Sequence, residues 1–271
     1  IEGGSLPLSF DVIVLDGYKL DNWWQTRAKL VANISVLITD PQSSAAVSCD
    51  VVLDSSPSEI PRQYCIPGRA KKLFGSQYAL IPKLARRELL SHEYLQREQS
   101  LFVVLGGSDP QQQSYNIAQA LVKINPQSGW RSICVVTGPL VSDEERERLK
   151  ELSKTHAVLS HQHNPENIYS LMSRATLAIS GSGVSAFELA FLGVPTILVP
   201  QAPNQIPLCE HLRINSDWAE IVFGGSPADI ATLAGHLWND CEWRQQSASA
   251  GREWIDGMGS QRARDAILAV L

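Results

Sequence analysis

Two turns rich in glycine and serine carry the residue types best suited to chemistry in this sequence. The first contains Gly106, Gly107 and Ser108, directly after the apolar run 101–105 and before a helical pattern at 115–124. Because glycine has no side chain, backbone N–H groups in such a turn can approach a phosphate, and a serine hydroxyl can add a hydrogen bond. The sequence therefore predicts a phosphate-binding turn here, with a turn that serves packing alone as the alternative.

The second turn, residues 180–183, follows another apolar run at 176–179 and opens a short helix. We expect Ser182 and Gly183 to face the same phosphates as the first turn. Glu188 lies further along this helix, where its carboxylate can accept hydrogen bonds from a ribose, as acidic residues do in nucleotide-binding folds. An ordinary solvent-facing position is the alternative for Glu188.

Polar side chains also follow the next predicted strand. Gly193 and Pro195 indicate the end of the short helix, and residues 196–199 have the pattern of a strand. Loops at the carboxyl ends of parallel strands hold ligands in α/β proteins. Asn204 and Gln205 lie in this exit loop and carry paired donors and acceptors, so we expect them to read a sugar.

A further ligand-facing position is expected near the start of the chain. Residues 10–15 form a near-continuous apolar run, which predicts a strand buried on both faces. Asp16 and Tyr18 follow at its carboxyl end and are the candidate catalytic residues, with Asp16 as a weak general base. A structural or substrate-orienting role is the more conservative interpretation of each.

His161 and His163 suggest a metal site, because imidazole is a common ligand of zinc. Neither a nearby cysteine nor an acidic cluster completes a ligand set, so we expect both histidines to line a loop and predict no metal or cofactor. The cysteines form no Cys-x-x-Cys pair, and reduced thiols in a cytoplasmic protein explain them best. They are Cys49, Cys65, Cys134, Cys209 and Cys241.

The composition argues against several classes of partner. The 271 residues carry a net charge of −5 without a basic stripe, so we expect no nucleic acid as partner. No apolar run approaches the ~18 residues that cross a bilayer, so we expect no membrane span. The chain starts at Ile1 and soon enters a buried type of strand, which leads us to expect a missing N-terminal segment or a partner chain in its place.

The order of the elements predicts two α/β domains. We expect residues 1–97 to form a partial N-terminal domain and linker, and residues 98–256 to form a nucleotide-binding domain. The last helix has an apolar stripe that includes Ile267 and Leu271. We therefore expect residues 257–271 to cross back to the first domain.

Capping residues mark the start of two helices. Asp21 or Asn22 can cap a helix that contains two tryptophans. Ser142-x-x-Glu145 has the spacing of a capping box, which predicts that these two side chains bond each other's backbone N–H groups at the start of an exposed helix. The charged helix expected at 83–98 is the best candidate for a linker.

Eight short motifs together resemble a known family. They are Asp16-Gly-Tyr18, Cys49-Asp50, Gly75-x-x-Tyr78-Ala-Leu, Gly106-Gly-Ser-Asp, Asn167-x-x-x-Leu171-Met, Glu188, Gly193-Val-Pro and Asn204-Gln205. The chain resembles the UDP-sugar hydrolases of the pseudaminic acid pathway, which are related to the lipid II synthase family of GT-B glycosyltransferases. The resemblance covers nearly the whole chain and is more specific in its second half.

The resemblance implies a GT-B-like α/β fold, with two Rossmann-like domains that contain parallel sheets, the N-terminal one incomplete. It implies that UDP or a UDP-sugar is held mainly by the C-terminal domain, with Glu188 as the ribose acceptor and Tyr18 as an active-site tyrosine. That family opens with a glycine-rich loop carrying a histidine thought to activate water, and this chain has no corresponding segment. The family also tends to have an acidic pair where this chain has Asp40-Pro41, and a histidine shortly before the Cys-Asp pair.

Three functions follow as hypotheses. The first is a UDP-sugar hydrolase that releases UDP from a deoxyamino sugar in the synthesis of surface polysaccharide or nonulosonic acid. The second is a GT-B glycosyltransferase that passes the sugar to an acceptor other than water. The third is a sugar-nucleotide binding module without catalysis, or a fragment completed by another polypeptide.

Overall fold

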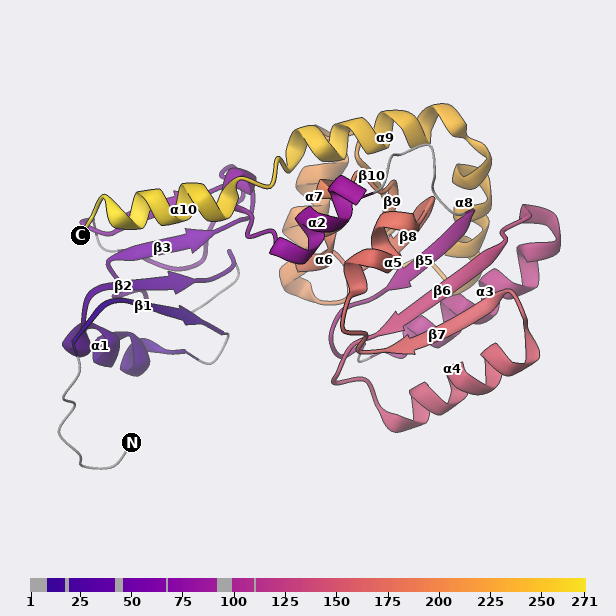
Figure 1. The fold of residues 1–271 in the computed structure, drawn as a ribbon, viewed down its shortest axis with the longest axis horizontal. Helices are drawn as coiled ribbons and strands as arrows, with labels where there is room; N and C mark the ends of the chain where they lie inside the picture. Colours follow the sequence, from indigo (N-terminus) through magenta and orange to yellow (C-terminus); the bar gives the residue numbers. More distant parts are fainter. Residues whose placement is uncertain (1–8, 18–19, 42–45, 67, 92–98, 110) are drawn as a thin grey trace. The chain divides into compact units, whose positions relative to one another are not determined.

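The computed structural model describes residues 9–17, 20–41, 46–66, 68–91, 99–109 and 111–271. Contacts between Cα atoms divide the chain into two compact units, Ile1–Leu80 with Gly257–Leu271, and Ile81–Asp256. Each unit contains one parallel sheet, as predicted for the fold class (Figure 1).

The sheet of the first unit has the order β1-β2-β3-β4, and all its neighbouring strands are parallel. Its strands are β1 Phe10–Asp16, β2 Ala32–Ile38, β3 Val51–Asp54 and β4 Lys71–Phe74. Helix α1 (Asn22–Val31) connects β1 to β2 and begins where the Asp21 carboxylate accepts hydrogen bonds from the N–H groups of Trp23 and Trp24. The predicted cap is therefore Asp21, while β4 was not predicted.

The last helix, α10 (Gly259–Leu268), packs on this same sheet. Ala263 and Ile267 contact the core formed by β2, β3 and β4, and Lys71 Nζ donates to the carbonyl of Ala266 at 3.0 Å. Leu271 is exposed instead of buried. The apolar stripe thus partly buries Ile267 but ends before Leu271, because the helix itself ends at Leu268.

The sheet of the second unit has six parallel strands in the order β10-β9-β8-β5-β6-β7. Their bounds are β5 Ser100–Val104, β6 Ser132–Thr137, β7 Leu159–His163, β8 Leu177–Ser180, β9 Thr196–Leu198 and β10 Ala219–Ile221. Strands β5 and β8 are buried along their whole length, as expected for central strands covered on both faces.

Helices cover the second sheet. They are α2 Lys83–Ser91, α3 Gln113–Ser128, α4 Asp143–Thr155, α5 Ile168–Arg174, α6 Val184–Phe191, α7 Ile206–Asn215, α8 Pro227–Asn239 and α9 Cys241–Trp254. Helix α3 packs against α8, and α6 packs against α9 (Figure 1). Helix α2 packs against α5, so the charged segment proposed as a linker contributes a helix to the second unit, which starts at Ile81. The rest of the predicted helix, residues 92–98, lies outside the described residues.

Strand β7 differs from its prediction. His161 and His163 lie inside this strand instead of in a loop, because β7 pairs with β6 through a register that places Val135 opposite His161 and Thr137 opposite His163. Backbone pairing with β6 extends β7 through polar residues whose sequence does not alternate as a strand would.

Candidate nucleotide-binding site

The two glycine turns lie side by side in the second unit. Strand β5 has β6 on one side and β8 on the other, so the chain reverses its direction of travel across the sheet between β5 and β8. Val104 and Ser180 are register partners at the ends of these strands, and Gly181 N donates to the carbonyl of Val104 at 3.0 Å. Ligands of open α/β sheets bind in the crevice at such a switch point, beyond the carboxyl ends of the strands.

The first turn is exposed, and the loop after β6 holds it in place. Gly106 has a φ of 101°, which favours glycine, while Gly107 and Ser108 are exposed to solvent. Gly138, just after β6, packs so closely that a Cβ atom on it would lie 2.5 Å from the Cα atom of Gly107. Leu140 N also donates to the carbonyl of Gly107 at 2.9 Å. The position of the turn is therefore fixed by the neighbouring loop.

The start of α3 is occupied by side chains of the protein itself. Asp109 caps the helix by accepting from Gln113 N at 3.0 Å and Ser114 N at 2.7 Å, and Glu145 accepts from Tyr115 N at 3.3 Å. The predicted capping box on α4 is thus only half formed. Ser142 Oγ accepts from Glu145 N, but the Glu145 carboxyl bonds to α3 instead of returning to Ser142.

The second turn is tied to the exit loop of β9 by Gln205. The amide oxygen of Gln205 accepts from Ser182 N at 3.1 Å, Ser182 Oγ at 3.2 Å and Gln201 N at 2.9 Å. A Cβ atom on Gly183 would lie 3.6 Å from Gln205 Nε2. Gln205 therefore lies at the second turn, and its amide oxygen holds that turn in place. Its neighbour Asn204 is half-buried.

Glu188 is not an ordinary solvent-facing residue. It is buried on α6 and accepts a hydrogen bond from the Tyr169 hydroxyl of α5 at 2.9 Å. Burial raises the pKa of Glu188, although the Tyr169 hydrogen bond opposes this. Burial and the neighbouring carboxylate likewise raise the pKa of Tyr169. Tyr169 was missed in the sequence because it carries no local signal of its contact with Glu188.

The two histidines of β7 share one partner. Thr137 Oγ1, at the end of β6, lies 2.9 Å from His161 Nε2 and 3.2 Å from His163 Nδ1. Burial lowers the pKa of His161, and the nearby His163 and Arg146 add to this effect. Within the described part of the chain, no group of three or more His, Cys, Asp or Glu residues has a geometry that could hold a metal ion.

Of the two candidate catalytic residues, Asp16 lies among the described residues of the first unit. Asp16 is exposed and ends β1, so it lies at the carboxyl edge of the sheet as expected. Tyr18 lies outside the described residues.

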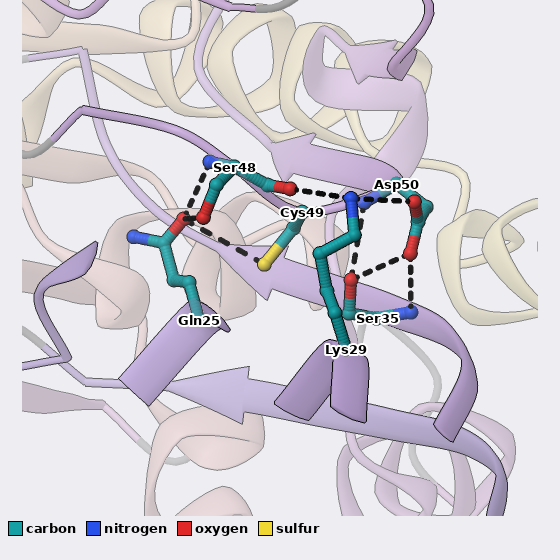
Figure 2. A network of polar contacts seen from close by, with 6 residues as sticks. All are labelled: Gln25, Lys29, Ser35, Ser48, Cys49 and Asp50. Atoms are coloured by element: carbon teal, nitrogen blue, oxygen red, sulfur yellow. Dashed lines mark hydrogen bonds and ion pairs between the residues drawn. The ribbon is translucent and has the colours of Figure 1, made fainter. Parts of the chain in front are cut away.

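The Cys49-Asp50 motif forms part of a polar network that joins α1 to β2 (Figure 2). Asp50 accepts from Ser35 N at 3.0 Å and Ser35 Oγ at 2.7 Å, and it forms an ion pair with Lys29 at 3.0 Å. Partial burial opposes ionisation, but the bonds from Ser35 and Lys29 lower the pKa of Asp50. The buried Gln25 accepts from Ser48 N at 2.8 Å. The contacts of this motif are therefore structural.

A second buried network, at the end of β3, was not predicted. Arg62 forms an ion pair with the fully buried Asp54 at 2.9 Å, and the Tyr64 hydroxyl donates to Asp54 at 2.9 Å. Arg62 and Tyr64 lie in the loop between β3 and β4, whose proline- and serine-rich sequence predicts a turn but not the partner of a buried charge.

Sequence comparison assigns the region that carries both turns. Residues 101–206 match the Glycosyltransferase family 28 C-terminal domain. The match runs from β5 to the start of α7 and contains Gly106, Ser182, Glu188 and Gln205. It supports a relationship at the level of glycosyltransferases, which is coarser than the hydrolase family that the motifs resemble.

Two relatives of this chain extend beyond the region of similarity. MJ1062 of Methanocaldococcus jannaschii, an uncharacterized protein, is 24% identical over 199 residues, which cover 70% of this chain and 40% of the relative. The spore coat polysaccharide biosynthesis protein SpsG of Bacillus subtilis is 23% identical over 237 residues, which cover 87% of this chain and 68% of SpsG. This chain therefore corresponds to less than half of the first relative and about two thirds of the second.

Solved structures establish the fold class. MurG of Acinetobacter baumannii superposes with a TM-score of 0.60 at 17% identity, covering 96% of this chain and 73% of MurG. MnaA of S. aureus, in a structure with UDP, superposes with a TM-score of 0.62 at 10% identity, covering 96% of this chain and 77% of MnaA. The fold is thus α/β with two parallel sheets and is similar to that of GT-B glycosyltransferases. No helix of the described residues has the length and apolar character to cross a membrane.

Proposed function

We propose that the second unit binds UDP and the UDP part of a UDP-sugar, and that the chain takes part in moving the sugar from UDP to an acceptor. The observation that carries this proposal is the adjacency of the two glycine turns at the switch point between β5 and β8. Backbone N–H groups of such turns stabilise phosphate charge, both on the bound nucleotide and on the departing UDP. The match of this region to a glycosyltransferase domain and the polysaccharide role named for SpsG support the same assignment.

The proposed reaction breaks the bond between the anomeric carbon of the sugar and the β-phosphate oxygen. UDP leaves with the bonding electron pair, and an acceptor oxygen forms the new bond to the sugar while losing a proton. Asp16 is the proposed general base for that proton, because it ends β1 at the carboxyl edge of the first sheet. Ser108 and the turn that contains Ser182 and Gly183 are proposed to contact the phosphates, Glu188 the ribose and Asn204 the sugar, while Gln205 holds Ser182 in place.

Calorimetric titration with UDP tests the binding proposal. We expect a single site that is lost when Ser182 and Gly183 are both replaced by valine, because two branched side chains would fill the turn. A control replaces Ser249, an exposed residue of α9, by valine and should bind UDP as the wild type does. The absence of UDP binding in the wild type would refute the proposal.

Hydrolysis and transfer differ only in the acceptor. A hydrolase needs only the UDP-sugar and water, and it releases one molecule of free sugar for each molecule of UDP. In a transferase, UDP release depends on an added acceptor, and the sugar is recovered on that acceptor. Mass spectrometry of the products, with and without candidate polysaccharide precursors, separates the two. Transfer is the better supported of the two at the level of family, because the matched domain is a glycosyltransferase domain.

A second candidate function is a donor-binding module that a further polypeptide segment completes. Strand β1 is an edge strand, and Phe10 and Val14 on it are exposed. Trp23, Trp24 and Leu30 of α1 are also exposed, which is unusual for large apolar residues near a parallel sheet. Hydrogen exchange of the β1 amides, with and without an N-terminal extension of the chain, tests this candidate. Equal exchange rates in the two proteins would reject it.

A further inference from the structure

Two carboxyl groups are buried together behind the first glycine turn. Asp109, directly after Ser108, is 3% exposed, and Glu145 of α4 is 1% exposed. The two carboxyl groups accept from neighbouring N–H groups of α3, Asp109 from Ser114 N and Glu145 from Tyr115 N, so they lie close together. Glu145 thus does not complete the capping box predicted on α4, and its carboxyl bonds to α3 beside Asp109 instead.

The pair fixes the joint between the turn and α3. Asp109 and Glu145 together accept hydrogen bonds from the N–H groups of Gln113, Ser114 and Tyr115. Asp109 also has a φ of 38°, a left-handed conformation that is costly for a residue other than glycine. Its bonds to Gln113 N and Ser114 N hold this conformation, and the same backbone leads directly into the exposed turn.

The Glu145 carboxyl holds its proton to a higher pH than an ordinary glutamate does. Burial and the adjacent Asp109 raise the pKa of Glu145 to about 7, while the bond from Tyr115 N and the charge of Arg148 oppose this. Arg148 lies 3.8 Å from the centre of the Tyr115 ring and donates to Gln112 Oε1 at 3.0 Å. Among the described residues, the charges of Asp109, next to the turn, and of Arg148 on α4 act on the pKa of Glu145. Two carboxylates in contact cannot both ionise without repulsion.

We propose that Glu145 is a positioning residue for nucleotide binding: the proton on its carboxyl beside Asp109 holds residues 106–108 in the binding conformation, and its loss weakens the binding of a nucleoside diphosphate. This inference rests on the proposed function of the turn. Ionisation of Glu145 creates repulsion between Asp109 and Glu145. It also adds a negative charge behind the turn that receives an anionic diphosphate. Both effects weaken the binding of the diphosphate.

The test compares the UDP dissociation constant of the wild type and of Glu145→Gln by calorimetry at about pH 6 and about pH 8.5. Glutamine is matched to protonated glutamate, because its amide can donate to Asp109 while its carbonyl accepts from Tyr115 N. We expect the wild-type dissociation constant to rise by at most about tenfold per pH unit above pH ~7, relative to the variant. The ionisation of UDP itself affects both proteins equally and cancels in this comparison. Glu144→Gln, on the exposed side of α4, should follow the wild type.

Asp109→Asn provides a second variant if Glu145→Gln folds poorly. It removes the neighbouring negative charge, so the pH at which UDP affinity begins to fall should move down. Parallel pH profiles for the wild type and Glu145→Gln, with UDP bound by both, would overturn the inference and leave the proposed function intact. Failure of both proteins to bind UDP at about pH 6 would overturn the proposed function and the inference that rests on it.

Discussion

The amide oxygen of Gln205 lies 3.1 Å from the backbone nitrogen of Ser182, and this contact joins the loop after β9 to the turn after β8. The same oxygen accepts from Gln201 N, so one side chain satisfies backbone donors of two loops. Such a residue determines the shape of a binding turn without necessarily touching the ligand.

Two substitutions of Gln205 separate its role in holding the turn from the effect of charge at the turn. Gln205→Ala leaves the N–H groups of Ser182 and Gln201 without this acceptor and should lower the free energy of unfolding by about 1 to 3 kcal/mol. Gln205→Glu retains an acceptor but adds a negative charge at the turn, so it should fold nearly as stably and bind UDP more weakly. Thermal melting and UDP calorimetry measure the two effects. Unchanged UDP affinity in both variants would remove Gln205 from the site.

Glu188 is predicted to contribute to UDP affinity through the ribose. Glu188→Ala should weaken UDP binding by roughly 1.5 to 3 kcal/mol, because a hydrogen bond to a charged acceptor is lost. Tyr169→Phe keeps the carboxylate and removes only its partner, so its loss should be smaller. The comparison of UDP with its 2′,3′-dideoxy analogue makes the test specific: the wild type should prefer UDP, and Glu188→Ala should not. An equal preference in wild type and variant would place the ribose elsewhere.

Gly138 is predicted to fix the position of the first turn through close packing against Gly107. A methyl group on Gly138 would lie 2.5 Å from the Cα atom of Gly107, whereas a methyl group on Gly107 meets no atom within 4 Å. Gly138→Ala should therefore lower the free energy of unfolding by about 1 to 3 kcal/mol and also weaken UDP binding.

The matched substitution, Gly107→Ala, should leave stability nearly unchanged and weaken UDP binding alone, because its methyl group projects into the space above the turn. Melting curves and UDP titrations of both variants provide the comparison. A Gly107→Ala variant with full UDP affinity would contradict the proposed position of the phosphates.

The buried ion pair of the first unit should matter more than any exposed one. Arg62→Ala removes the cationic partner of the buried Asp54. The substitution should therefore destabilise the first unit by about 3 to 5 kcal/mol. Arg264, which pairs with Asp265 at an exposed position, is the control, and Arg264→Ala should cost less than about 1 kcal/mol. Denaturant unfolding followed by tryptophan fluorescence measures both. Equal stability of the two variants would refute the importance of this pair.

The sequence predicted those features that depend on local backbone requirements. Gly106 and Gly193 both adopt positive φ, so their places at a turn and at a helix end could be inferred from residue type alone. Most strands of the two sheets followed from apolar runs, but β4 was not predicted, and β1, predicted to be buried on both faces, is partly exposed. Strands β5 and β8 are neighbours in the sheet, which agrees with the expectation that both turns face one ligand.

The contacts made across the chain could not be inferred in this way. Glu145 has the correct spacing for a capping box with Ser142, yet its carboxyl bonds to α3, since burial beside Asp109 outweighs the local pattern. Gln205 was expected to read a sugar, but its oxygen holds Ser182. Only the fold decides which donors meet a given side chain.

Asp16 carries the last prediction, which concerns catalysis. If Asp16 is the general base, Asp16→Asn should lower the rate of UDP release from a UDP-sugar by about 10²- to 10⁴-fold while UDP affinity stays unchanged, because the proposed nucleotide site lies in the second unit. Asp11→Asn is the control, since Asp11 is an exposed carboxylate on the same strand. Turnover is followed as UDP release with acceptor present and absent. A rate for Asp16→Asn equal to that of Asp11→Asn would exclude Asp16 as the base, and Tyr18→Phe would then be the next variant to assay.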